Sequence, residues 1–361
     1  MKLAQFDYEL PKELIASYLI SPRDHSKLML IDKQKNKIGH YHFLDLHDLL
    51  NKNDVLVFNK TKVFPARLIG RRLSQNMNEV GANIEILLHK KINNNIWEAV
   101  YKGHLKANDR ISFGKFKAEI IEKTENIVKI RFLTGRNIFG LLQKYGHTPI
   151  PPYIKTVADE NYLRKSYQTV YAKEIGSIAA PTAGFHFTKS LLQKLKAKGV
   201  QMEYLTLHVG LGTFEPIRED DINHHKLYSE YFVLNSRTAN RLNKAKLMNR
   251  NIVSVGTTTT RVLETCAKFN KKYKSYLLEP RTGYTSIFIY PPYKFKFVDC
   301  LITNFHLPKS TLLTLVSAFV SFPNTKDGFT DFNLSLMGKA YRQAIRRMYR
   351  FYSFGDSCLI R

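Results

Sequence analysis

Apolar and polar positions follow two different patterns along this chain, and the change between them predicts two kinds of structure. Near the amino end, short apolar runs at 28–32 and 55–59 are typical of buried strands, and a short helix is predicted between them at 44–50. From 65 to 147 the pattern changes to short alternating runs separated by turn residues. Six such runs at close spacing predict a small β-barrel, and they lie at 66–70, 84–88, 96–100, 110–113, 118–121 and 127–132.

Beyond the proline-rich segment 149–152 the pattern of an α/β fold returns. The predicted helices lie at 191–198, 236–248, 312–322 and 339–349, the predicted strands at 201–209 and 252–255, and a last strand and loop at 350–360. One more helix is predicted to open at Arg261, after Gly256 and four threonines. We therefore predict an α/β main domain made of residues 1–64 and 148–361, with a six-stranded β-barrel domain inserted at 65–147.

Three segments of the second half combine small residues, one histidine and apolar neighbours. They lie at 179–188, 206–216 and 301–308. Glycine allows the backbone to approach a ligand closely, and histidine exchanges protons near neutral pH. Three segments of one kind predict a single pocket assembled from loops.

The segment Gly256–Arg261 lies between a predicted strand and a predicted helix. Such a turn presents backbone N–H groups at the positive end of the helix dipole, where a carboxylate or a phosphate binds. The alternative is simple capping of the helix by a threonine.

At these segments the chain resembles a known family. The sequences AAPTAGFHFT, TLHVGLGTFEPI, VGTTTTRVLE, TNFHLPKSTLL and YRFYSFGDSCLI are similar to those of the S-adenosylmethionine:tRNA ribosyltransferase-isomerases of the queuosine pathway. Residues 6–11 and 146–154 match as well, and the resemblance runs in order from residue 6 to residue 360. It implies a barrel inserted into an α/β domain.

The resemblance also implies a reaction. The ribosyl part of S-adenosylmethionine is transferred to 7-aminomethyl-7-deazaguanine at the tRNA wobble position and rearranged to an epoxycyclopentane, which gives epoxyqueuosine-tRNA. Adenine and methionine leave. S-adenosylmethionine is then a consumed cosubstrate, and no separate cofactor is expected.

This chemistry needs proton transfers and recognition of a guanine-like base. An amine and a carbon beside the sulfonium must lose protons, and adenine must gain one. A histidine or a carboxylate could remove either proton, and His186, His208 and His306 are the candidate catalytic residues. A lone histidine among apolar residues is more often structural. A carboxylate pairs with the two N–H donors of such a base, which points to Glu215, Glu230 or Asp356, although an Asp after Gly is also a common turn residue.

The predicted substrate-binding residues come from the same segments. They are Ala180, Thr182, Gly184, Gly210, Gly212, Thr213, Glu215, Glu230, Gly256, Thr257, Thr258, Arg261, Asn304 and Asp356.

Four positions depart from the family pattern. Lys60 replaces an aspartate, Lys27 and Lys62 each replace an arginine, and Tyr228 stands where a histidine is usual. Lysine lacks the bidentate fork of arginine, and Lys60 reverses a charge. These departures motivate the alternative of a non-catalytic tRNA-binding protein. A second alternative, an RNA methyltransferase that uses S-adenosylmethionine, lacks support because no strand-to-helix G-x-G motif opens the chain.

The charge balance predicts an anionic partner. Lys and Arg number 56 against 30 Asp and Glu, a net charge of +26, although a genome rich in lysine codons would contribute to this excess. The predicted barrel alone has 15 basic and 7 acidic residues. The predicted tRNA contacts are Arg67, Arg71 and Arg72 in the barrel and a stripe of the last helix, Lys339, Arg342, Arg346 and Arg350, which has no acidic neighbour at helical spacing.

The remaining composition predicts an intracellular setting. The three cysteines lack metal-ligand spacing, so no metal site is expected, and a sparse odd set favours a reducing compartment. The amino end has no apolar signal-like region, and no apolar stretch reaches about 18 residues. We expect a cytoplasmic monomer that does not contact membranes.

Overall fold

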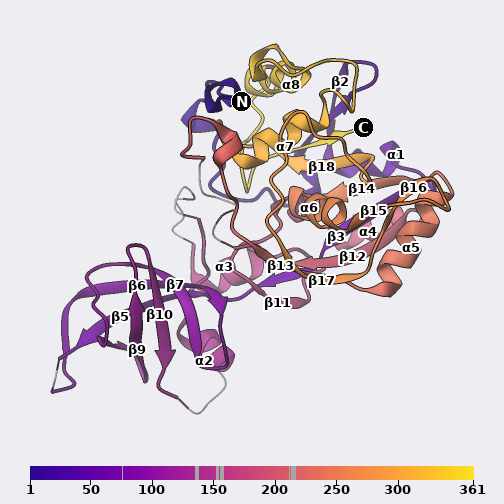
Figure 1. Cartoon of the computed structure of the whole chain (residues 1–361). Coiled ribbons are helices and arrows are strands. Elements are labelled where there is room, and N and C mark those ends of the chain that lie inside the picture. The colour runs from indigo at the N-terminus through magenta and orange to yellow at the C-terminus, as the bar shows by residue number, and fades with distance from the viewer. Residues whose placement is uncertain (75, 135–137, 152–153, 155–157, 211, 213–216) are drawn as a thin grey trace.

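The computed structural model describes residues 1–361 except 75, 135–137, 152–153, 155–157, 211 and 213–216. It contains a large α/β body and a smaller barrel beside it (Figure 1). No helix of the described residues is long and apolar enough to cross a membrane.

A nine-stranded mixed sheet forms the centre of the body. Its order is β17 (Arg281–Thr285), β13 (Glu230–Leu234), β12 (Gln201–Leu207), β3 (Asp54–Asn59), β14 (Asn251–Val255), β18 (Cys300–Asn304), β19 (Ser357–Ile360), β1 (Lys27–Asp32) and β2 (Lys37–His42). The four strands from β12 to β18 are parallel. All residues of β3 are buried, as expected for a parallel strand covered on both faces.

Helices cover the two faces of this sheet. They are α1 (Leu46–Leu49), α4 (Lys189–Ala197), α5 (Ser236–Leu247), α6 (Thr257–Cys266), α7 (Thr311–Phe319) and α8 (Leu336–Arg346). Helix α3 (Glu160–Ser166) packs through Leu163 in a separate small cluster. Because side chains alternate along a strand, Val55 and Val57 of β3 pack in one core with α5, α6, α7 and α8, and Leu56 and Phe58 pack in another with α1 and α4. Side chains of Thr188, Asn235, Ser310 and Ser335 cap α4, α5, α7 and α8.

The barrel is closed and entirely antiparallel. Its strands are β5 (Arg67–Leu73), β6 (Glu79–Lys91), β7 (Ile96–Lys102), β8 (Arg110–Phe113), β9 (Phe116–Lys123) and β10 (Ile127–Phe132), and α2 (Ile138–Tyr145) packs against it. Alternation along β6 turns Ile84, Ile86 and Leu88 inward. The predicted six-stranded barrel and α/β body are confirmed. The exact domain limits at 65 and 147 stay a prediction.

Several predicted helix boundaries are wrong, among them the end of α7 at Phe319 instead of residue 322, and two of the errors bear on the predicted site. Helix α6 begins at Thr257, not at Arg261, so the four threonines belong to the helix, and the hydroxyls of Thr259 and Thr260 donate to the carbonyls of Val255 and Gly256. Helix α8 ends at Arg346, since the chain turns at Met348, which adopts a left-handed φ of 53°. Arg350 therefore does not continue the helical stripe.

Several short elements have no counterpart in the sequence prediction. They are α2, α3, β2, β4 (Thr61–Val63), β11 (Glu174–Ser177), β13, β15 (Ala267–Asn270), β16 (Ser275–Leu278), β17 and β18.

Candidate active site

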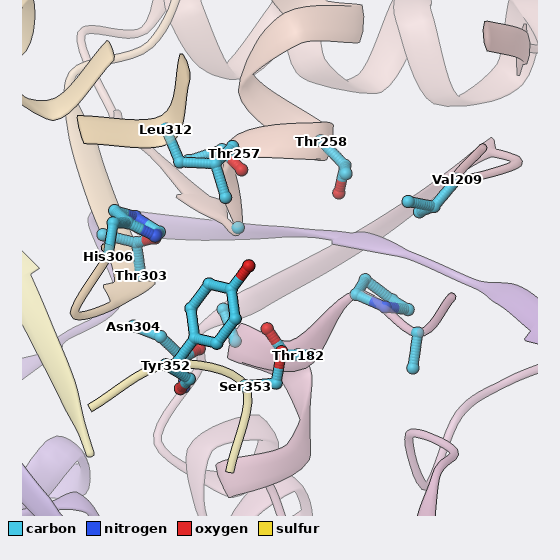
Figure 2. A pocket seen from close by; sticks show the side chains of 14 residues that line it. Thr182, Val209, Thr257, Thr258, Thr303, Asn304, His306, Leu312, Tyr352 and Ser353 are labelled. Carbon is cyan, nitrogen blue, oxygen red and sulfur yellow. The ribbon is translucent and has the colours of Figure 1, made fainter. Parts of the chain in front are cut away.

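A cavity lies at the carboxyl ends of β14 and β18, the edge where open α/β sheets place their ligands (Figure 2). It encloses about 460 Å³ of empty space, including its open mouth. Its lining is rich in small and hydroxyl side chains and comes from five separate parts of the chain. Seven predicted site residues line it: Ala180, Thr182, Gly256, Thr257, Thr258, Asn304 and His306.

The start of helix α6 forms one wall of this cavity. Gly256 occupies the N-cap position with a left-handed φ of 88°, and no side chain caps the helix. The first turn of α6 therefore presents uncapped backbone N–H groups at the part of the cavity wall that Gly256, Thr257 and Thr258 form. Thr258 accepts a 3.4 Å hydrogen bond from Asn59 Nδ2, which also donates to the carbonyl of Leu207. Threonine capping, the alternative to ligand binding, is not what the structure shows.

His306 is the histidine that lines the cavity. Its Nε2 lies 3.0 Å from the hydroxyl of Thr303, and its backbone N–H donates to the Tyr341 hydroxyl at 2.9 Å. Burial lowers the pKa of His306 to about 3, so the imidazole is neutral at pH 7.

His186 lies behind the cavity wall, in contact with Asn304. Its Nδ1 is 2.7 Å from Ser26 Oγ, its Nε2 is 3.4 Å from Asn304 Nδ2, and its ring stacks on Phe43. Burial, with smaller contributions from Arg23 and Arg350, lowers the pKa of His186 to about 3. The segments of His186 and His306 therefore converge on one cavity.

His208 lies apart from this cavity, although its neighbour Val209 lines it. His208 Nδ1 is 2.7 Å from the hydroxyl of Thr61, and the ring stacks on Tyr231. Gly176 packs against the ring so closely that a Cβ at that position would lie 2.6 Å from His208 Nε2. Burial lowers the pKa of His208. Its predicted catalytic role stays a prediction.

A buried ion pair joins β13 to α6. Glu230 and Arg261 are 3% and 5% exposed, and Arg261 Nη1 donates to Glu230 Oε2. The other carboxylate oxygen accepts from the backbone N–H of Gly210 at 2.8 Å. Glu230, Arg261 and Gly210 were predicted to bind substrate; the structure brings them together outside the lining of the cavity.

Asp356 also lies outside the lining. Its two oxygens accept the backbone N–H groups of Lys27 and Arg350 at 2.9 and 2.8 Å, and burial raises its pKa. These contacts are those of a carboxylate that holds a turn, and its predicted role in base recognition stays a prediction.

Gly184 and Gly212 are closely packed by side chains, and their predicted role in substrate binding stays a prediction. A Cβ on Gly184 would lie 2.0 Å from the Tyr171 hydroxyl, and one on Gly212 would lie 2.7 Å from the ring of Tyr228. Thr213 and Glu215 fall outside the described residues.

The predicted tRNA contacts divide into paired and unpaired cations. In the barrel, Arg67 pairs with Glu85 at 3.2 Å and Arg72 with Asp109 at 3.9 Å, and Arg71 is exposed. On α8, Lys339, Arg342 and Arg346 are exposed and line a groove with Asn36 and Ile38 of the β2 region. Within the described part of the chain, no carboxylate is ion-paired with these three. Arg350 instead donates to the carbonyl of Tyr18 and lies over its ring.

Comparison with known proteins decides the family. A family model described as queuosine biosynthesis protein matches residues 3–360. The chain belongs to this family.

Curated relatives of the queuosine biosynthesis family match along the whole chain. The relative from Sulfurihydrogenibium sp. (strain YO3AOP1) is 48% identical over 365 residues, and those from Staphylococcus haemolyticus and Staphylococcus saprophyticus are each 44% identical. Each match covers 100% of both chains, and all three proteins are named S-adenosylmethionine:tRNA ribosyltransferase-isomerase.

A solved structure of the family has the same fold. S-adenosylmethionine tRNA ribosyltransferase from Thermotoga maritima is 33% identical, with a TM-score of 0.54, and the match covers 99% of this chain and 100% of that one.

The departures of this chain from the family pattern lie outside the cavity lining. Lys60 pairs with Glu174 at 3.1 Å, Lys62 is exposed, and Tyr228 is 49% exposed. The reversed charge at Lys60 is therefore balanced locally.

Some residues that line the cavity were not predicted from the sequence. Tyr352 and Ser353 lie just before Asp356, in a segment singled out only for its carboxylate, and Thr303 lies within the His306 segment and Leu312 follows it. Among the described residues, no group of three or more His, Cys, Asp or Glu side chains is placed to hold a metal ion.

Proposed function

We propose that this chain transfers and isomerises the ribosyl moiety of S-adenosylmethionine onto 7-aminomethyl-7-deazaguanine at the tRNA wobble position, releasing adenine and methionine. The observation that supports this most is the full-length identity of 44–48% to enzymes with that name, combined with a cavity built from the same motif segments.

In this proposal the cavity holds S-adenosylmethionine. The methionine carboxylate binds the free N–H groups at the start of α6, where the dipole favours an anion. The ring of Tyr352 projects into the cavity and offers a flat apolar face to the purine (Figure 2). The ribose between these two ends then faces the mouth, where the amine of the tRNA base enters.

His306 is the proposed proton acceptor. It lines the cavity, it is neutral at pH 7, and the Thr303 contact at Nε2 fixes its ring. A neutral imidazole can accept a proton from the incoming amine or from the carbon beside the sulfonium. The burial that lowers the pKa of His306 also weakens it as a base, so its place in the cavity carries this proposal.

For tRNA, the groove of about 660 Å³ between α8 and β2 is the proposed main phosphate contact. The barrel is a second surface, through Arg71 above all, because Arg71 is exposed and has no ion pair among the described residues. We also propose a cytoplasmic location, because the proposed substrate is a tRNA. We further propose a monomer.

One assay separates this function from its alternatives. The protein is incubated with S-adenosylmethionine and tRNA that carries the aminomethyl base, and the products are separated by chromatography. Release of adenine and methionine supports the proposal. S-adenosylhomocysteine would indicate a methyltransferase, and tRNA binding without turnover would indicate a non-catalytic binding protein.

Substitution of His306 tests its role. His306→Gln keeps a side chain that hydrogen bonds but does not take up a proton, so turnover is expected to fall by about 10²–10⁴-fold while tRNA affinity stays within a few-fold. His208→Gln, measured alongside, tests the remaining histidine. A His306→Gln variant with near-normal turnover would remove His306 from the mechanism.

A further inference from the structure

The amide of Asn304 at the end of β18 has a fixed orientation. Its nitrogen, Nδ2, donates to the carbonyl of Tyr352 at 3.0 Å. A carbonyl only accepts hydrogen bonds, so the amide nitrogen must face Tyr352 and the amide oxygen must face away from it.

His186 accepts a hydrogen bond from the second N–H of the same amide. Its Nε2 lies 3.4 Å from Asn304 Nδ2, and it can accept only while it is unprotonated. Burial keeps it so by lowering the pKa of His186 to about 3. In this tautomer the proton is on Nδ1, and the Nδ1–H group donates to Ser26 Oγ at 2.7 Å. The imidazole ring also stacks on the ring of Phe43, which fixes its orientation.

These contacts leave one group of the network without a partner. Asn304 is 3% exposed and lines the cavity, and among the described residues its Oδ1 accepts no hydrogen bond. An unsatisfied buried acceptor is costly, and a ligand that brings an N–H or O–H donor to it recovers that cost.

We propose that His186 is a positioning residue that aims Asn304 Oδ1 at the 6-amino group of the adenine ring, so that Asn304 selects the adenosyl cosubstrate. This inference rests on the proposed function, which assigns the cavity to S-adenosylmethionine.

Three donors of that cosubstrate are candidates for Asn304 Oδ1. The methionine ammonium follows the carboxylate to the start of α6, and the ribose hydroxyls face the incoming amine. The 6-amino group remains. Tyr352 both orients the Asn304 amide and offers a surface for the adenine. Its carbonyl accepts from the Asn304 amide, and its ring projects into the cavity beside Asn304, where an adenine would stack (Figure 2).

The test compares S-adenosylmethionine with its 6-oxo counterpart, in which an acceptor replaces the amino group. The wild-type protein is expected to favour the 6-amino compound in kcat/KM by at least about 100-fold, because two acceptors would face each other in the 6-oxo complex. Dissociation constants of both compounds, measured by calorimetry, should show the same preference.

Variants then separate positioning from proton transfer. Asn304→Ala should raise KM for S-adenosylmethionine by about 10–100-fold, change KM for the 6-oxo compound by less than about threefold, and so remove the preference. His186→Gln, whose side-chain oxygen can accept from the Asn304 amide, should keep the preference, and His186→Leu should lose it. Thr182→Ala, a control in the same cavity without a contact to the amide, should affect both compounds alike.

Other results would overturn the inference. If the wild type does not discriminate, or if Asn304→Ala keeps the preference, Asn304 does not recognise the 6-amino group. If His186→Gln lowers kcat for both compounds by about 10²–10⁴-fold with the preference unchanged, His186 carries a proton. Thermal unfolding of each variant verifies its fold, and Asn304→Ala with His186→Gln decide the question if His186→Leu does not fold. Failure of the wild type to release adenine would count against the proposed function instead.

Discussion

The body and the barrel treat polar side chains in opposite ways. Within the six barrel strands, Ser112 is the one buried polar residue, and the charges pair on the surface, as Lys90 with Glu98 and Arg131 with Glu119. The body buries His186, His306, Asp356 and the Glu230–Arg261 pair. Buried polar groups destabilise a fold unless they are satisfied, so their presence in the body, which holds the cavity lined by His306, and their near absence from the barrel strands indicate where function has shaped the chain. The barrel has the pattern of a scaffold.

The largest expected effect concerns the buried pair. Glu230→Ala leaves the buried guanidinium of Arg261 without its carboxylate and frees the N–H of Gly210. The free energy of unfolding should fall by about 3–5 kcal/mol, measured by urea denaturation. A loss below about 1 kcal/mol would mean that water or another group replaces the carboxylate, and the contrast with the barrel would weaken.

The next effect is a dependence of stability on pH. The folded protein holds His186 and His306 with a pKa of about 3, below the value of about 6.5 in an unfolded chain. Between these values the unfolded state binds more protons, so stability is complete above pH 6.5 and falls as the pH is lowered. Each histidine should cost about 1.4 kcal/mol per pH unit, or about 2 kcal/mol between pH 6.5 and 5.

Denaturation series at several pH values test this slope. In His306→Gln, the slope of the free energy of unfolding against pH should be smaller by the contribution of one histidine, about 1.4 kcal/mol per pH unit. An unchanged slope in this variant would show that His306 is not held neutral in the folded state.

A smaller effect concerns tRNA binding. Arg342→Gln with Arg346→Gln removes two unpaired cations of the α8 groove, and should reduce the slope of log K against log salt by about two units. Lys90→Gln with Arg131→Gln removes two paired cations of the barrel, and should reduce it by less than one unit. Filter binding at several salt concentrations measures both. If both double variants reduced the salt slope equally, the barrel would contribute as much to tRNA binding as the α8 groove.

The smallest effect belongs to the barrel's surface pairs. Lys90 and Glu98 face each other across β6 and β7 with an N–O distance of 3.3 Å, and the lysine side chain is 53% exposed. A double-mutant cycle that combines Lys90→Ala with Glu98→Ala should give a coupling energy of about 0–1 kcal/mol. A coupling comparable to the loss in Glu230→Ala would contradict the contrast between the two regions.

The sequence predicted the barrel better than the site, for a physical reason. Barrel strands alternate between core and solvent, so their period of two is visible in residues such as Ile84, Ile86 and Leu88. The start of α6 was placed too late because threonine favours helices weakly, and the hydrogen bonds that keep Thr259 and Thr260 helical depend on the fold.

The segments that form the cavity were predicted, but the contacts that define the site were not. The distance between His186 and Asn304 joins residues 118 positions apart, and the Tyr352 carbonyl reaches Asn304 across 48. No local pattern encodes such contacts. Tyr352 also has a left-handed φ of 74°, which aromatic residues rarely adopt, and nothing in the surrounding sequence marks it.

The place of β19 in the sheet sets an order for assembly during translation. Strands β1 and β2 join the rest of the sheet through β19, which pairs with β1 on one side and β18 on the other. Residues 27–42 are thus among the first synthesised, yet they cannot dock until residues 357–360 have left the ribosome. The barrel strands, all within 67–132, close on themselves much earlier. In that interval β1 and β18 each expose an unpaired edge, and the nascent body is open to chaperones and to mispairing while the barrel beside it is already complete.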